Sequence, residues 1–474
     1  MRQHSFCFLE NRFSTFCYLF IFFLCLSCAN ERPTDSQVAP PTLVSQDGAY
    51  EAPPVRTFPS PPNEIHTWIA QGNLPQIRSH AWDIWESITI DTSLDANFPI
   101  WETWYSGHEI FDMAEPANQS FAKTRVFEDP AQFTHFSSGV TSTIPRDAPQ
   151  QPTSFNKFSK SLADVIVDRG FNKQATLDSI NADFNQSNTP IADREISTSI
   201  DTIDTQSFAL KPVFQFISGT EPTALPYWRG NSTFYTTNQL NPEPHTWRQC
   251  VVLDPTGNLA PGSTHSMPCN GEIGEWPVVS LDDIYHFTLT AAEADAFSHF
   301  AETSGDDLGA NNDADSASIA EMVKEGNIAL MMAMHVTGKE IVNWTWQTFW
   351  WSPAPNTKPW GHDRPSTIPS PWSNYNTRTA YFMTWDNDAP TGEPLIAFSP
   401  YLETNLSGNF IYKQDTVQWK GVFSNCMTCH RLAAYPGSQY TSGGFVNKGD
   451  SLLFSNNVKT DFLWSIPTRA AAAE

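Results

Sequence analysis

Two cysteines and a histidine stand in the spacing Cys-x-x-Cys-His near the end of the chain, in the stretch SNCMTCHRLAAYPG. The three residues are Cys426, Cys429 and His430. Two thiols and an imidazole in this order suit three kinds of site: a zinc centre, a redox dithiol and a covalently attached c-type haem. The rest of the sequence separates these alternatives.

Zinc and a redox dithiol both fit poorly. Tetrahedral zinc needs a second ligand pair, and the only other cysteines in the later part of the chain, Cys250 and Cys269, are 19 positions apart. A thioredoxin-like dithiol begins a helix after a strand of a βαβ unit, whereas this motif lies late in a Pro-rich chain that is rich in predicted strands.

A c-type haem fits every position of the motif. The two thiols add across the porphyrin vinyl groups, the two-residue spacer matches the separation of those groups, and the adjacent histidine places an imidazole under the iron. The sequence therefore predicts one covalent haem c, attached to Cys426 and Cys429, with His430 as the proximal iron ligand.

The motif resembles that of c-type cytochromes in general. The wider stretches MHVTGKEIVNWTWQTFWW, PYLETN and NCMTCHRLAAYP are similar to those of an uncharacterised family of large monohaem bacterial proteins, known only as cytochrome c family proteins. This resemblance covers about half of the body and implies no particular substrate. What it implies for single residues is limited to the attachment cysteines, Cys426 and Cys429, and the proximal ligand His430.

The second axial position of the iron has no obvious ligand in the tail. No Met or His follows His430, so this position is filled from upstream, by a weaker donor such as Lys448 or Tyr435, or by water. Met and His are the usual second ligands of haem iron in electron-transfer proteins, which directs the search upstream.

His335 is the first choice for this distal ligand. In the apolar run IALMMAMHV, a strand would place His335 on one face with Ala329 and Ala333, which are small enough to let a porphyrin approach. Met334, on the other face, is the alternative, followed by Met331. His335 as a hydrogen-bonded core histidine is the competing interpretation. His108 and His362 lie beside aromatic residues and are further alternatives.

The first 28 residues indicate export. The uncharged apolar run 13–26 is 14 residues long, too short to span a bilayer, which takes about 20. Cys28 in LSCAN resembles the last position of a bacterial lipobox, while cleavage after Ala29 would give a freely secreted protein. We expect an exported protein of the bacterial periplasm or an outer-membrane lipoprotein anchored through Cys28.

Export also predicts the state of two of the remaining cysteines. In an oxidising compartment Cys250 and Cys269 are expected to form a disulfide rather than to remain two buried thiols.

The 27 Lys and Arg residues against 51 Asp and Glu give a net charge of −24, which disfavours nucleic acid as a partner.

The elements that must position the motif are read from periodicity. Residues 29–62 are rich in Pro and polar residues and are predicted to be a tether. Residues 63–474 are predicted to form a single large β-rich body, with the haem-bearing segment at about 400–474. Apolar positions in 73–88 predict an amphipathic helix, and Thr290 with Glu293 predicts a capping box.

Strands dominate the later part of the chain. Residues 207–217 alternate with period two, and Pro212 favours an edge position for this strand. The runs 328–336 and 344–350 predict a hairpin of two buried strands. The expected fold class is α+β and β-rich, with antiparallel strands, peripheral short helices and a C-terminal haem-bearing segment.

These patterns favour an exported cytochrome that transfers electrons to a redox partner that the sequence does not specify. In this interpretation no residue is catalytic. Two alternatives are a haem enzyme, peroxidase-like or acting on another small molecule through an open distal site, and a ligand-binding body with an accessory haem.

Overall fold

The hairpin predicted around residue 340 forms the centre of the main sheet. In the computed structural model, β10 (Ile328–Gly338) and β11 (Thr345–Trp351) run antiparallel, with His335 opposite Thr348 and Thr337 opposite Trp346. Opposed side chains in such a pair point to the same face of the sheet, and successive side chains on one strand point to opposite faces. His335 and Trp346 therefore lie on one face, and Met334 lies on the other, as predicted.

The structure describes the following residues, those of 407–412 and 415–420 as backbone only: 60–92, 98–111, 153–198, 206–228, 247, 249–269, 271–295, 323–358, 360–382, 399–401, 407–412, 415–420, 426–437 and 446–472. The predicted leader 1–28 with Cys28 and nearly all of the tether 29–62 lie outside these ranges.

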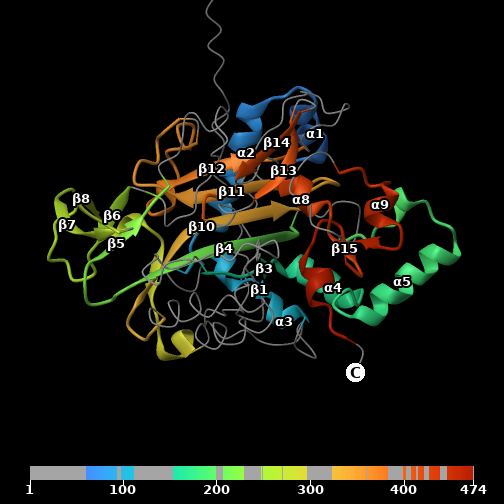
Figure 1. Cartoon of the computed structure of the whole chain (residues 1–474), viewed down its shortest axis with the longest axis horizontal. Helices are drawn as coiled ribbons and strands as arrows, with labels where there is room; N and C mark the ends of the chain where they lie inside the picture. Colours follow the sequence, from blue (N-terminus) through green and yellow to red (C-terminus); the bar gives the residue numbers. More distant parts are fainter. Residues whose placement is uncertain are drawn as a thin grey trace, which may run out of the picture. The chain divides into compact units, whose positions relative to one another are not determined.

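The main sheet has eight strands, and Figure 1 shows its long members side by side. Its path runs through β1 (Tyr105–Ser106), β3 (Lys157–Phe158), β4 (Phe208–Ile217), β10, β11 and β12 (Tyr375–Thr379). Two short strands complete it: β2 (Thr153–Ser154) pairs with β4, and β9 (His286–Thr288) pairs with β10.

The prediction that residues 207–217 form an edge strand is wrong. This strand, β4, pairs with β10 along one side and with β2 and β3 along the other. Pro212 is accommodated because β3 pairs with Ala209 and Leu210 while β2 pairs with Val213 and Phe214, so the proline falls in the gap between two short partners.

A β-bulge in β10 changes which residues accompany His335. The register with β4 shifts between Met331 and Ala333. An extra residue in one strand reverses the in-and-out alternation beyond it. Ala329 therefore lies on the face of Met334, and the prediction that Ala329 and His335 share a face is wrong. Of the two small residues predicted beside His335, only Ala333 stays on its face.

The amphipathic helix predicted at 73–88 is confirmed as α2 (Leu74–Ile88). Its apolar stripe is fully buried against the face of the sheet that carries Met334, where Trp85 stacks on Phe349 with ring centroids 4.2 Å apart. Asn73 caps the helix by accepting a hydrogen bond from the Gln76 amide. The aromatic side chains thus fix one layer of helix on one face of the sheet.

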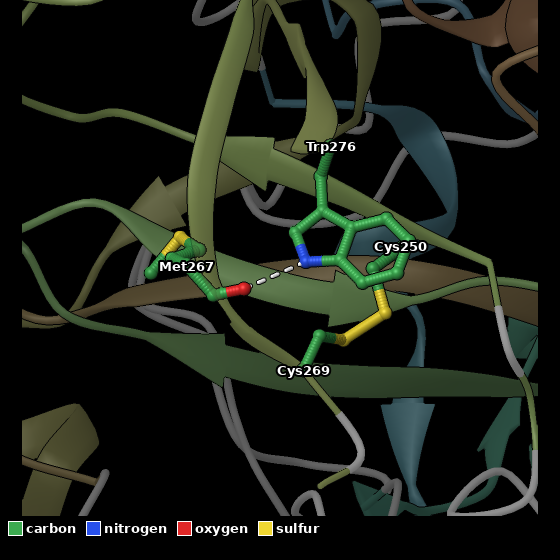
Figure 2. Close-up of a disulfide and its surroundings, with 4 residues drawn as sticks. All are labelled: Cys250, Met267, Cys269 and Trp276. Atoms are coloured by element: carbon green, nitrogen blue, oxygen red, sulfur yellow. Dashed lines mark hydrogen bonds between the residues drawn. A yellow bond between two sulfur atoms is a disulfide. The ribbon is translucent and has the colours of Figure 1, made fainter. Parts of the chain in front are cut away.

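A second sheet, of four strands, carries the disulfide. Its order is β5 (Thr223–Pro226), β6 (Cys250–Leu253), β8 (Glu272–Val279) and β7 (Thr264–Cys269). Figure 2 shows the predicted bond between Cys250 and Cys269, which joins β6 to β7 with the Cα atoms 6.6 Å apart. Beside it the Trp276 indole donates a hydrogen bond of 2.8 Å to the Met267 carbonyl, across β7 and β8.

The remaining elements are short. Two antiparallel two-stranded sheets pair β13 (Ser407–Tyr412) with β14 (Asp415–Lys420) and β15 (Ala434–Tyr435) with β16 (Val458–Lys459). The other helices are α1 (Pro62–Ala70), α3 (Gly107–Phe111), α4 (Lys160–Asp168), α5 (Gln174–Gln186), α8 (Cys426–His430), α9 (Ser451–Phe454) and α10 (Ser465–Arg469). The described residues also include the 3₁₀ turns η1 (Ile100–Thr103), η3 (Ile191–Asp193), η5 (Leu281–Asp283) and η6 (Trp372–Asn374).

Antiparallel sheets with short helices confirm the α+β, β-rich fold class, and in the described sheets only β6 and β8 pair in parallel. The predicted capping box is also confirmed, because the Thr290 amide and hydroxyl both donate to Glu293, whose own amide donates back to Thr290. In the part of the chain that the structure describes, no helix is long and apolar enough to cross a membrane.

Candidate functional site

The Cys-x-x-Cys-His motif forms one helical turn, α8. Residues three apart on a helix lie on the same side, so Cys426 and Cys429 share one side of this turn, and His430 follows directly. Both cysteine side chains are buried. Cys426 belongs to the core cluster that also contains Met427, Trp346 and Phe462, so the motif is part of the body of the protein.

His430 is oriented through its ring nitrogen Nδ1. This atom lies 2.8 Å from the carbonyl oxygen of Phe462. A carbonyl oxygen only accepts hydrogen bonds, so Nδ1 carries the hydrogen and Nε2 of the neutral ring carries the lone pair. A histidine that donates from one nitrogen to a backbone carbonyl and keeps the other as a base has the arrangement of a metal ligand.

Two tryptophans hold α8 from the sides. The Trp346 ring on β11 lies against the His430 ring, with centroids 4.4 Å apart. The Trp464 indole donates a hydrogen bond of 3.2 Å to the Cys429 carbonyl at the end of α8. Segment 460–464 therefore closes over the motif, while β11 supports it from the sheet.

A buried carboxylate lies directly before Phe462. Asp461 is 3% exposed and accepts hydrogen bonds from three residues. Lys339, just after β10, donates from Nζ at 2.5 Å, and Trp344, just before β11, donates from its indole at 3.2 Å. Thr198 donates to the other carboxylate oxygen, from its amide at 2.9 Å and from its hydroxyl at 2.8 Å.

The backbone at this position is unusual for residues with side chains. Asp461 has φ of 48° and Phe462 has φ of 68°, both in the left-handed region. Each non-glycine residue in this region costs roughly 1–2 kcal/mol. Such strained backbone persists only where the surrounding contacts hold it in place. Here it directs the Phe462 carbonyl toward His430.

A second ion pair, which is partly buried, flanks the motif. Arg431 lies 3.5 Å from a carboxylate oxygen of Glu195, and its guanidinium lies over the Phe462 ring, 4.7 Å from the centroid. Burial raises the pKa of Glu195, an effect that the Arg431 charge opposes. Burial likewise lowers the pKa of Arg431. The pair adds packing and charge on the side of Phe462.

The predicted distal ligands fall on different faces. His335 shares the face of Thr337 and Trp346, and Trp346 contacts His430, so His335 lies on the sheet face over which α8 is placed. It is partly exposed. Met334 points to the opposite face, opposite Phe349, and is fully buried in the core beneath α2.

The other predicted donors lie at varied places. Tyr435 donates a hydrogen bond of 2.9 Å to Asp178 on α5, and Lys448 is exposed. His108 and His362 are exposed as well. Within the described ranges no group of three or more His, Cys, Asp and Glu side chains is arranged to hold a metal ion.

Comparison with known proteins adds no relative: no family model, no curated protein and no solved structure matches this chain.

The sequence did not reveal the residues that orient His430. Asp461 and Phe462 carry no motif, and two successive left-handed residues with side chains cannot be read from composition. Lys339 was part of a predicted hairpin turn. The one available signal was Lys339 in a largely apolar hairpin, since a lysine needs a partner of opposite charge if it is buried.

Proposed function

We propose that this protein is an exported c-type cytochrome that carries one covalent haem and transfers electrons. The observation that carries the proposal is the geometry of His430, whose Nδ1 is bonded to the Phe462 carbonyl so that Nε2 is the basic nitrogen. The same helical turn presents two sulfur atoms on one side, as attachment to two vinyl groups requires.

The chain supplies a fitting set of donors for this group. Cys426 and Cys429 would hold the porphyrin by thioether bonds, and His430 would bind the iron. When bound, the haem supplies a one-electron redox centre. Trp346 would pack against the proximal imidazole and keep its ring from turning. The buried surroundings of the motif would limit the access of water and so affect the reduction potential.

For the distal position the placement of side chains favours His335 over Met334. His335 lies on the sheet face that supports α8, whereas Met334 is packed beneath α2 on the other face. Ala333, the next residue on the face of His335 toward the bulge, is small, and Trp350 stands opposite it on β11.

Export is supported by two features of the chain. One is the short apolar run 13–26 followed by Cys28, which suits a cleaved leader and lipid attachment. The other is the disulfide between Cys250 and Cys269, since such bonds persist in oxidising compartments. We therefore propose a periplasmic or outer-membrane location, with lipid attachment at Cys28 as its tether.

Absorption spectroscopy with added ligands tests electron transfer against haem enzymology. The purified haem protein is titrated with cyanide in the oxidised state and with carbon monoxide in the reduced state. A low-spin spectrum that neither ligand changes supports a six-coordinate electron carrier. A high-spin spectrum that both ligands change would overturn this function in favour of a haem enzyme with an open distal site.

A further inference from the structure

The carboxylate of Asp461 lies where three separate segments of the chain meet. Lys339, Trp344 and Thr198 together make four hydrogen bonds to its two oxygens. A carboxylate that is 3% exposed is stable in its charged form only with such partners. Its side chain is therefore fixed relative to the hairpin of β10 and β11 and to the segment after η3.

The backbone that follows this anchor is fixed as well. Thr460 donates from its amide to the Ala433 carbonyl at 2.9 Å, just beyond α8, and accepts from the Leu463 amide at 2.9 Å. Between these contacts stand the two left-handed residues, Asp461 and Phe462. The anchored carboxylate offsets the cost of this conformation, which without it would relax and move the Phe462 carbonyl away from Nδ1 of His430.

We propose that Asp461 is a positioning residue for His430: it holds the Phe462 carbonyl in place, fixes Nε2 as the basic ring nitrogen and thereby sets the reduction potential of the haem. The part that concerns the haem rests on the proposed function. A hydrogen bond from Nδ1 makes the imidazole a stronger donor through Nε2, and a stronger donor stabilises ferric over ferrous iron. Weakening the anchor therefore raises the potential.

A simpler effect of Asp461 would be that of its charge alone. The two effects differ in sign at Lys339. If charge alone acted, Lys339→Met would remove a positive charge and lower the potential, and Thr198→Val, which changes no charge, would leave it unchanged. If Asp461 acts by holding the Phe462 carbonyl, both variants loosen the anchor and both raise the potential.

The experiment measures reduction potentials of the wild-type haem protein and of Asp461→Asn, Lys339→Met and Thr198→Val by redox titration. We expect a higher potential in all three variants. Thr198→Val is nearly isosteric and keeps the measurement informative if loss of the buried ion pair prevents folding of the others. A lower potential in Lys339→Met, or an unchanged one in Thr198→Val, would overturn the positioning role.

A second readout does not depend on the haem. In the haem-free chain labelled with ¹⁵N-histidine, the shifts of His430 report which ring nitrogen carries the hydrogen. We expect one tautomer, with hydrogen on Nδ1, in the wild type and a mixture of both in Thr198→Val and Asp461→Asn. A wild type that carries no haem would contradict the proposed function, while unchanged tautomers in the variants would contradict the role of Asp461.

Discussion

The Nδ1 atom of His430 lies 2.8 Å from the carbonyl oxygen of Phe462, a residue 32 positions later in the chain. This contact joins the short helix that carries both cysteines to the segment that closes over it. The accepting carbonyl belongs to a residue with left-handed backbone, directly after the buried carboxylate of Asp461.

The distal position of the iron is tested by His335→Ala. If His335 binds the iron, its loss leaves the position to water and converts the low-spin spectrum to a high-spin one, because water is the weaker ligand. The absorption spectrum of the oxidised protein reports the change. Met334→Leu is the matched control, since this residue points to the other face and its replacement is expected to leave the spectrum unchanged. A low-spin spectrum that persists in His335→Ala would show that another residue fills the position.

The disulfide between Cys250 and Cys269 is expected to stabilise the four-stranded sheet. It closes a loop with a sequence separation of 19 residues. In the chain-entropy model, loops of this size contribute about 3 kcal/mol. The double variant Cys250→Ala, Cys269→Ala should lose about this amount in urea unfolding, in a transition that includes β5 to β8. The haem content of this variant should match that of the wild type. An equal urea midpoint in the wild type and the variant would contradict the stabilising role of the disulfide.

Lys459 makes stability depend on pH in the alkaline range. Burial lowers the pKa of its ammonium group to about 8. Between this value and the ordinary pKa of 10.5 the unfolded chain binds more protons than the folded one, so the contribution of Lys459 to stability rises with pH. Below pH 8 Lys459 is charged in the folded protein, and burial of this charge lowers the free energy of unfolding by its full amount.

The variant Lys459→Met isolates this effect. The difference between its free energy of unfolding and that of the wild type should be largest in favour of the variant below about pH 8. This difference should shrink as the pH rises toward 10, because the wild type gains stability over this range. Urea titrations of both proteins at several pH values give this difference. The contributions of all other titrating groups cancel in it, because both proteins share them. A difference that does not vary with pH would mean that Lys459 keeps its ordinary pKa in the folded protein.

Much of the scaffold could be predicted because apolar periodicity determines it. The stripe of α2 and the pairing of β10 with β11 each follow one spacing rule, and both are present in the fold. The two wrong predictions, the edge position of β4 and the shared face of Ala329 and His335, concern features that depend on the neighbouring strands. A proline also fits inside a sheet where two short partner strands leave a gap, as β2 and β3 do at Pro212. The bulge after Met331 depends on the register between β10 and β4, which the sequence of β10 alone does not contain.

The candidate site was predictable in its motif but not in its supports. Thiol and imidazole spacing identifies Cys426, Cys429 and His430 without any knowledge of the fold. The ion pair of Lys339 with Asp461 joins residues 122 positions apart, and no local pattern predicts a contact at that distance in sequence. The left-handed conformation of Asp461, a residue other than glycine, is likewise not predicted by local rules.

Covalent attachment of haem to Cys426 and Cys429 is the central claim, and intact-protein mass spectrometry tests it most directly. The full-length protein is produced in a bacterium with its c-type haem attachment system and analysed after denaturation, beside the variant Cys426→Ala, Cys429→Ala. We predict a mass increase of one haem in the wild type, retained under denaturing conditions together with a reduced haemochrome spectrum, and neither signal in the variant. A wild-type chain with the mass of its polypeptide alone, or a variant that keeps the added mass, would contradict the account.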